Sequence, residues 1–350
     1  MTVMIGIDPH KRSHTAVALD EHDAVLDELR VDADARQITR LLAWADGWPQ
    51  RIWAIENANG LGLLLSRQLL EAGQQVRDVP AALSAQVRKL SGSGHKTDAY
   101  DARSTAIAGR HARRLRTVVP DGAPQVLGLQ LERRARVVAA RQRVLVGIHE
   151  QLVKLIPGGV ARDLSATKAA AALRKIHPTD PVGAMRRRVV VELLAELRSL
   201  DRKRKILDAE LKQALDDYGT CLMNIDGIGP VAAATIISIV GDIRRFPNAD
   251  HFASFTGTAP VAASSGEVVR YRLNLGGQRQ MNKVLHIAAR VQISLPDSAG
   301  RVYIHRKLDE GKTRPEAIRS LKRHLANVVY RALQADLAAQ EVSGEDNQAA

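Results

Sequence analysis

The 350-residue sequence has very little cysteine and no long apolar run. The single cysteine, Cys221, rules out a disulfide framework and a cysteine zinc site, and we expect a reducing compartment, the cytoplasm. No stretch has the uninterrupted apolar length of a transmembrane helix. The first residues, MTVMIGIDPHK, also lack the order of basic, apolar and small residues found in a secretory signal. We therefore expect no membrane partner.

Basic residues outnumber acidic ones, 51 against 38, for a net charge of +13. Residues 1–100 carry 11 basic and 13 acidic side chains, so the remaining residues carry 40 and 25, a net charge of +15. A surplus of this size indicates a polyanionic partner. Solvated helix faces explain any single run of charge equally well, but they do not explain the asymmetry between the two parts.

The first part of the chain has the pattern of a mixed α/β domain. Apolar or alternating segments at 3–8, 15–19 and 25–31 predict three strands. Alternating helices and strands follow: helices over 35–44 and 61–70, strands over 51–56 and 75–79, a helix opened by Pro80, and a helix over 98–114. Three strands followed by this alternation are typical of a ribonuclease-H-like fold, which we assign to residues 1–118.

The rest of the chain is predicted to be helical. The segment 119–124 contains two prolines and a glycine and indicates a linker. Beyond it, two apolar seams have heptad-like steps: Val138, Leu145, Ile148, Leu152 and Leu155, then Val190, Leu193, Leu197, Leu200, Leu207 and Leu211. They predict an antiparallel hairpin or a coiled coil that pairs protomers. We assign 119–218 to this helical linker, 219–340 to a mostly helical C-terminal domain with a last helix over 315–339, and 341–350 to a disordered tail.

Four carboxylates have a pattern suited to metal binding. Asp8 and Glu56 each end an apolar strand, and Asp98 and Asp101 lie three residues apart on one face of a helix. If the two strands are neighbours, the acids meet at one edge of the sheet and provide the hard oxygen ligands that Mg²⁺ prefers. Taken singly, each acid also fits a turn or a helix cap.

Two groups of segments resemble one known family. Ile5-Gly6-Ile7-Asp8-Pro9-His10-Lys11, the Glu56 strand and Lys96-Thr97-Asp98-Ala99-Tyr100-Asp101-Ala102 resemble the acid motifs of the DEDD-type insertion-sequence transposases, a family that also contains the Piv-type DNA invertases. Farther along, segments 225–230, 252–260 and Ser264-Ser265-Gly266 are similar to the C-terminal domain of the same family.

The resemblance implies a domain related to Holliday-junction (RuvC-like) resolvases, a helical linker and a C-terminal domain with a nucleophilic serine. It further implies that this serine attacks a DNA phosphate and that Mg²⁺ held by Asp8, Glu56, Asp98 and Asp101 completes the site. Ser265 matches the nucleophile by its position before Gly266, and Ser264 is its competitor. The family also implies a homo-oligomer, a dimer or a tetramer, and a guide RNA encoded beside the gene. Ser-Ser-Gly alone is typical of an exposed turn.

Four further residues are candidates for contact with nucleic acid. Arg270 and Arg272 follow the serine loop and can clamp a phosphate, or they form an exposed basic strand face. Gly227 and Gly229 lie in a turn like that of a helix-hairpin-helix motif, where backbone amides approach a phosphate. Tight packing between helices explains these glycines equally well.

The sequence thus predicts a Mg²⁺-dependent recombinase that cuts and rejoins DNA. One alternative is a nuclease or junction resolvase that uses the four acids with water as nucleophile. Another is a nucleic-acid-binding protein with an inactive catalytic domain, against which the complete acid set argues. A tyrosine recombinase that uses Tyr303 or Tyr330 would leave the acids without a purpose.

Overall fold

The computed structural model describes residues 2–90, 97–112, 115–161, 163–262, 271–274 and 276–348. The chain divides into two compact units, Met1–Asp121 and Gly122–Ala350. The boundary between them falls in the proline-containing segment 119–124.

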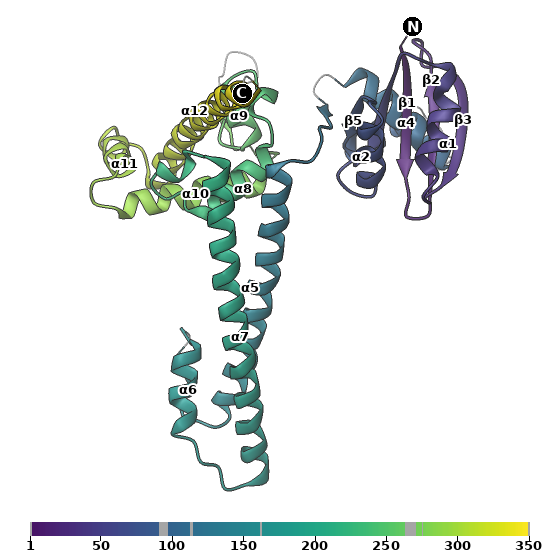
Figure 1. The fold of residues 1–350 in the computed structure, drawn as a ribbon. Coiled ribbons are helices and arrows are strands. Elements are labelled where there is room, and N and C mark those ends of the chain that lie inside the picture. The colour runs from purple at the N-terminus through teal and green to yellow at the C-terminus, as the bar shows by residue number, and fades with distance from the viewer. Residues whose placement is uncertain are drawn as a thin grey trace. The chain divides into compact units, whose positions relative to one another are not determined.

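A six-stranded mixed sheet organises the first unit (Figure 1). Its spatial order is β3-β2-β1-β4-β5-β6. The strands are β1 (Val3–Pro9), β2 (Ser13–Leu19), β3 (Val25–Asp32), β4 (Arg51–Glu56), β5 (Val76–Val79) and β6 (Arg116–Thr117). β1, β2 and β3 pair antiparallel, whereas β4 is parallel to both β1 and β5. The predicted mixed α/β unit is confirmed, and the short edge strand β6 is an addition that the sequence did not reveal.

Helices cover both faces of this sheet. They are α1 (Gln37–Trp44), the 3-10 helix η1 (Ala45–Gly47), α2 (Leu63–Glu71), α3 (Ala81–Leu90) and α4 (Asp98–His111). Leu41 of α1 and Leu65 of α2 share a core with Ile5 and Ile55 of the central strands. Ala102 and Ala106 of α4 pack with the alternate sheet residues on the other face. The central strands are therefore buried on both sides, which explains their continuous apolar sequences.

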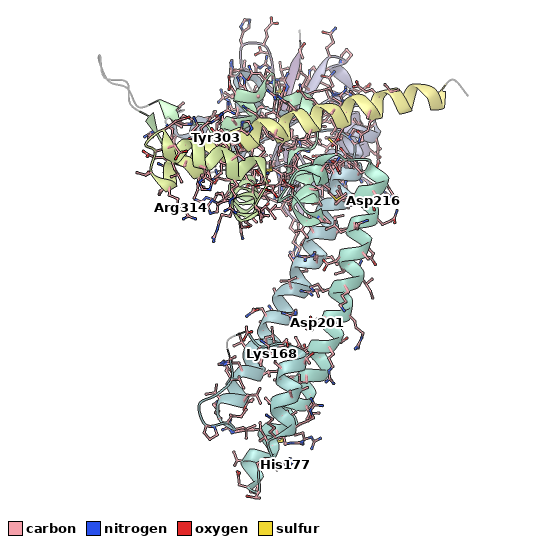
Figure 2. All side chains as sticks on the ribbon, turned by 90° about the vertical axis from the view of Figure 1, so that its left-hand side faces the viewer. Lys168, His177, Asp201, Asp216, Tyr303 and Arg314 are labelled. Atoms are coloured by element: carbon pink, nitrogen blue, oxygen red, sulfur yellow. The ribbon has the colours of Figure 1, made fainter. Side chains whose placement is uncertain are left out.

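A long helical hairpin begins the second unit. Helix α5 (Ala123–Val153) and helix α7 (Pro181–Tyr218) lie side by side, and the shorter α6 (Ala166–Arg174) packs against α7 (Figure 1). Ion pairs cross the hairpin from Arg134 to Asp208 and from Arg141 to Asp201, so the two helices run antiparallel. Figure 2 shows Asp201 along the hairpin and His177 at the end of the hairpin. The antiparallel hairpin, one of the two predicted arrangements, thus forms within the chain.

The ends of α7 follow from its sequence. Its first turn is capped by the Asp180 carboxylate, which accepts a hydrogen bond from the Gly183 amide at 2.8 Å, and Pro181 occupies the first position. Gly219, with φ of 73°, ends the helix in the left-handed conformation that glycine favours.

The remaining elements form a helical body around one core. They are η2 (Leu222–Asn224), α8 (Pro230–Val240), η3 (Ile243–Arg245), α9 (Ala249–Phe255), β7 (Val261–Ala262), β8 (Tyr271–Arg272), α10 (Arg279–Ser294), α11 (Ala299–Asp309) and α12 (Arg314–Gln348). Leu127 of α5 and Leu215 of α7 share this core with α8, α10 and α12. Helix α12 extends to Gln348, into the segment 341–350 that we expected to be a disordered tail. No helix among the described residues is long and apolar enough to span a membrane.

Candidate active site

Strand alternation places Asp8 and Glu56 on the same face of the sheet. Ile7 of β1 is paired in parallel with Ile55 of β4, so the acids that follow them lie side by side at the carboxyl ends of the two strands. Ile7 and Ile55 point into the core on the α1 and α2 face. Because successive strand residues point to opposite faces, Asp8 and Glu56 point to the α4 face.

Helix α4 lies unusually close to β1 because Gly6 has no side chain. A Cβ atom on Gly6 would lie 2.1 Å from the Ala102 carbonyl oxygen and 2.7 Å from the Ala106 Cβ. No other residue type fits in that space without displacing the helix. Gly6 therefore sets the distance between the strand that carries Asp8 and the helix that carries Asp98 and Asp101.

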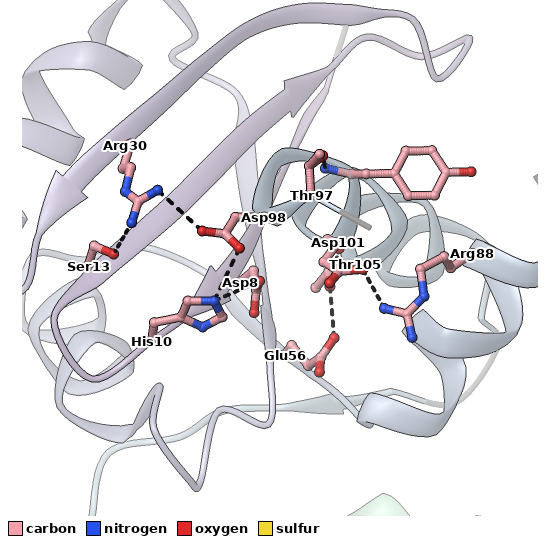
Figure 3. A network of polar contacts seen from close by, with 11 residues as sticks. Asp8, His10, Ser13, Arg30, Glu56, Arg88, Thr97, Asp98, Asp101 and Thr105 are labelled. Carbon is pink, nitrogen blue, oxygen red and sulfur yellow. Dashed lines mark hydrogen bonds and ion pairs between the residues drawn. The ribbon is translucent and has the colours of Figure 1, made fainter. Parts of the chain in front are cut away.

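The first turn of α4 carries the other two acids. The helix begins after Thr97, whose hydroxyl accepts a hydrogen bond from the Tyr100 amide at 3.2 Å. Asp98 and Asp101 both lie in this turn, where the helix dipole favours negative charge. Figure 3 shows the four carboxylates around the ends of β1 and β4 and the start of α4.

His10 lies between two of the acids. Its Nε2 atom is 3.3 Å from Asp98 Oδ1 and 3.7 Å from Asp8 Oδ2 (Figure 3). Arg30, from β3, approaches Asp98 from the other side, with Nη1 3.4 Å from Oδ2. Asp8, His10 and Asp98 each offer one ligand atom, and these atoms lie within 4.8 Å of one another.

Asp101 and Glu56 share a second set of contacts. Arg88, near the end of α3, forms an ion pair with Asp101. The buried Thr105 hydroxyl donates to the Asp101 main-chain oxygen at 2.9 Å and lies 3.4 Å from Glu56 Oε2. One turn of α4 thus links the Asp101 backbone to the Glu56 carboxylate (Figure 3).

The loop after Glu56 is held by a further carboxylate. Asn57 has a φ of 50°, the left-handed region that asparagine tolerates better than most residues. Asp78 of β5 accepts hydrogen bonds from the Ala58 amide at 2.9 Å and from the Asn59 side chain at 3.1 Å. These contacts fix the direction in which the chain leaves the end of β4.

Asp8 is only 8% exposed and lies close to the other three carboxylates. Burial raises its pKa to about 6, repulsion from Glu56, Asp101 and Asp98 adds to the shift, and His10 opposes it. Burial lowers the pKa of His10, but attraction to Asp8 and Asp98 outweighs this, and the net pKa is raised. A divalent cation among these oxygens would relieve the repulsion, so the donor set suits such an ion.

Comparisons with known proteins match two separate parts of the chain. Residues 5–157 match the "Transposase" family model DEDD_Tnp_IS110, and residues 219–304 match "Transposase IS116/IS110/IS902 family". The chain is 27% identical to the insertion element IS116 uncharacterized 44.8 kDa protein of Streptomyces clavuligerus, with 94% of each chain covered. The chain belongs to the DEDD-type insertion-sequence transposases.

Two further relatives and one solved structure are also similar to this chain. The insertion element IS900 uncharacterized 42 kDa protein of Mycobacterium paratuberculosis is 26% identical to the transposase, with 94% of each chain covered. The pilin gene-inverting protein of Moraxella lacunata is 27% identical over 33% of this chain and 37% of its own. Among solved structures, T. thermophilus RuvC in complex with Holliday junction substrate covers 34% of this chain and 100% of its own, with 16% identity and a TM-score of 0.27.

The residues predicted to contact nucleic acid are spread over the second unit of the transposase. Ser264, Ser265 and Arg270 lie outside the described residues, whereas Arg272 is exposed on β8. Gly227 has a φ of 82°, and a Cβ there would lie 2.8 Å from the Ala288 carbonyl oxygen, so packing against α10 requires glycine.

Gly229 is exposed and precedes α8, with open space where a Cβ would be. The roles of these glycines and arginines in binding remain predictions.

The two tyrosines of the alternative hypothesis have side-chain contacts within the second unit. Tyr330 is buried, and its hydroxyl donates to the Phe246 carbonyl oxygen at 3.3 Å. Tyr303 stacks on His324 with the ring centroids 5.2 Å apart. Neither is near the transposase carboxylates in sequence, and both belong to the second unit.

Four residues that contact the carboxylates had no predicted role: His10, Arg30, Arg88 and Thr105. His10 was visible beside Asp8 in the first motif, but its bridge to Asp98 depends on the fold. Arg88 and Thr105 come from α3 and α4, and nothing local in their sequence marks them. The packing of α3 on α4 brings Arg88 to Asp101, and the packing of α4 on β4 brings Thr105 to Glu56.

Proposed function

We propose that this transposase cuts and rejoins DNA at a site formed by Asp8, Glu56, Asp98 and Asp101 together with a serine nucleophile, Ser265. The observation that supports it best is the convergence of two strand-end acids with the first turn of α4. The two family matches cover the acid segments and the Ser-Ser-Gly segment separately.

The four carboxylates are proposed to hold Mg²⁺. Such an ion would polarise the attacked phosphate and stabilise the charge that develops on its oxygens. The His10 ring contacts both Asp8 and Asp98. The Arg88 guanidinium forms an ion pair with Asp101. His10 adds a nitrogen donor, which Mn²⁺ accepts more readily than Mg²⁺, so both ions should be tested.

Ser265 is proposed to form the covalent bond to DNA. Its oxygen would bond to the phosphorus as a DNA phosphorus–oxygen bond breaks, and the serine proton would leave to a base or to solvent. The phosphoester formed keeps the bond energy for rejoining, which a water nucleophile would lose. Arg270 and Arg272 are proposed to neutralise the attacked phosphate.

The proposed partners, nucleic acid and further copies of this chain, follow from the positive charge of the chain and from its family. DNA, and a guide RNA encoded beside the gene, would bind the positively charged part of the chain beyond residue 100. A homo-oligomer, a dimer or a tetramer, would bring two DNA ends together. The hairpin of α5 and α7 is proposed to take part, because Val146, Val153 and Met185 are exposed apolar residues on its surface.

One alternative has an observation in its favour. All four carboxylates belong to Met1–Asp121, so this unit alone assembles the acid cluster. A metal-dependent nuclease or Holliday-junction resolvase with water as nucleophile would need nothing more.

An assay of strand cleavage, on DNA that contains the element ends, distinguishes the serine-dependent recombinase from the nuclease or resolvase that uses water. The wild type, Glu56→Gln and Ser265→Ala should be compared with Mg²⁺, with Mn²⁺ and with a chelator. We expect Glu56→Gln and the chelator to abolish cleavage, and Ser265→Ala to abolish it as well. Cleavage that persists in Ser265→Ala and still needs Glu56 would support the resolvase.

A further inference from the structure

A second concentration of like charge lies in the Gly122–Ala350 unit, on helices α10 and α12. Basic side chains follow one face of α10 at steps of four, three and four residues: Arg279, Lys283, His286 and Arg290. Helix α12 packs against α10 and adds Arg319 and Lys322. Two of these groups, Lys322 and His286, are partly buried.

The Lys322 ammonium is held by Asn282, which is itself held by two main-chain carbonyl oxygens. Its Nζ donates to Asn282 Oδ1 at 2.5 Å. The Asn282 amide nitrogen donates in turn to the Thr256 and Gly257 carbonyl oxygens, at 3.1 and 3.0 Å. Because both carbonyls need a donor, the Asn282 oxygen must face Lys322. The ammonium keeps further N–H groups for a ligand.

The charged groups that act on Lys322 and His286 are all cations, although Arg319 also attracts Glu316, which lies one turn before it on α12. Burial and the Arg319 guanidinium lower the pKa of Lys322, and burial, Lys322 and Arg290 lower that of His286. In the described part of the chain, none of these four basic side chains forms an ion pair. Nearby cations do: Arg323 pairs with Asp250, and Lys307 with Glu310. A half-buried lysine without a carboxylate is unusual and is stabilised by an anion.

Asn282, the partner of Lys322, contacts residues that precede β7 in the sequence. Thr256 and Gly257, which Asn282 holds, precede β7, and Gly277 follows β8. A Cβ on Gly277 would lie 2.3 Å from the Gly257 Cα, so the two glycines are in close contact. Lys322, which Asn282 contacts, therefore lies close to residues that precede β7 and follow β8 in the sequence.

We propose that Lys322, His286, Arg290 and Arg319 bind a backbone phosphodiester of nucleic acid. Lys322 would act as a fixed point charge, and the exposed guanidinium groups of Arg290 and Arg319 would donate paired hydrogen bonds to phosphate oxygens. The proposal rests on the proposed action on DNA, but it concerns binding alone. DNA and RNA share this chemistry, and the test separates them.

The test measures binding of the full-length protein to a labelled DNA duplex of arbitrary sequence, and to single-stranded RNA, over a salt titration without divalent ions. Arg290→Ala/Arg319→Ala should bind about tenfold or more weakly, and its slope of log affinity against log salt should fall by about 1 for each lost contact. Arg133→Ala/Arg188→Ala is the control, because it removes the same charge from cations already paired with Glu210 and Glu192. It should bind like the wild type.

Lys322→Met provides a second test, with folding checked by circular dichroism. It should also reduce the affinity and the slope. A loss for DNA alone or for RNA alone identifies the ligand. Unchanged affinity and slope for both nucleic acids in Arg290→Ala/Arg319→Ala overturn the proposal, even if Lys322→Met does not fold. Failure of Ser265 as nucleophile leaves this outcome unaffected, because the assay involves no cleavage.

Discussion

Arg88 and Asp101 form an ion pair that joins the end of α3 to the first turn of α4. The pair neutralises one acid of a cluster in which Asp8, Glu56 and Asp98 also carry negative charge. Arg88 is therefore the counter-ion of Asp101, and a divalent ion that binds Asp101 would compete with it.

We expect Arg88→Ala to lower the melting temperature of the metal-free protein, because Asp101 then lies unpaired beside three carboxylates. Added Mg²⁺ or Mn²⁺ should stabilise this variant more than the wild type. Thermal melts with and without each ion measure both effects. Lys89→Ala, which removes an exposed neighbour, is the control. Equal melting temperatures for Arg88→Ala and the control would show that the pair has no such role.

The raised pKa of Asp8 gives a pH dependence of stability. The folded-state pKa is about 6 against 3.8 for the ordinary group, mainly because of burial. The folded protein therefore binds the proton more tightly, and it loses stability as pH rises from about 4 to about 6. Asp8→Asn removes this cost, so the metal-free variant should be more stable than the wild type by about 1–3 kcal/mol above pH 6.

Chemical denaturation at several pH values checks this prediction. The difference between Asp8→Asn and the wild type should shrink towards pH 4. The affinity of the wild type for a divalent ion should fall over the same range, since protons and metal compete for Asp8. A difference that does not vary with pH would mean that Asp8 ionises normally.

Gly6 provides a test of how closely α4 must approach the sheet. Gly6→Ala should destabilise the protein by about 1–3 kcal/mol or more, because the new methyl group overlaps the α4 backbone. It should also weaken metal binding by moving Asp98 and Asp101 away from Asp8. Gly47→Ala is the matched control, since a Cβ at Gly47 meets nothing within 4 Å. Similar unfolding curves for the two variants would be incompatible with this account of the packing.

Thr105 is expected to position Glu56. Thr105→Val keeps the shape of the side chain but removes the hydroxyl that lies 3.4 Å from Glu56 Oε2. Loss of such supporting contacts weakens metal binding by about 10- to 100-fold in typical sites. Calorimetric titration with Mn²⁺ measures the change. Unaltered affinity in a folded Thr105→Val protein would restrict the residue to a structural role.

Much of the first unit was predictable because its signals are local. Apolar strands ending in Asp8 and Glu56, and a capped helix beginning at Asp98, need only short-range patterns. The parallel pairing of β1 with β4 then brings two of these ends together. Edge strand β6 was not predicted, since a two-residue strand leaves no periodic signal.

The other residues of the site depend on long-range packing. Arg30 reaches Asp98 from β3, and Arg88 reaches Asp101 from α3, through contacts that no sequence spacing encodes. The hairpin shows the same limit: the predicted seam included Val138, yet Val137 is buried and Val138 is 37% exposed. A one-residue shift of this kind follows from the partner helix, whose path the seam alone does not define.

The measurement that tests the central claim most directly is the trapping of denatured protein–DNA adducts. Wild type, Ser265→Ala and Ser264→Ala should be incubated with element-end DNA and Mg²⁺, with Asp8→Asn as the control for the carboxylate site. We expect an adduct in the wild type and in Ser264→Ala, and none in Ser265→Ala or Asp8→Asn. An adduct that persists in Ser265→Ala would contradict the assignment, and its loss in Ser264→Ala alone would move the nucleophile one residue upstream.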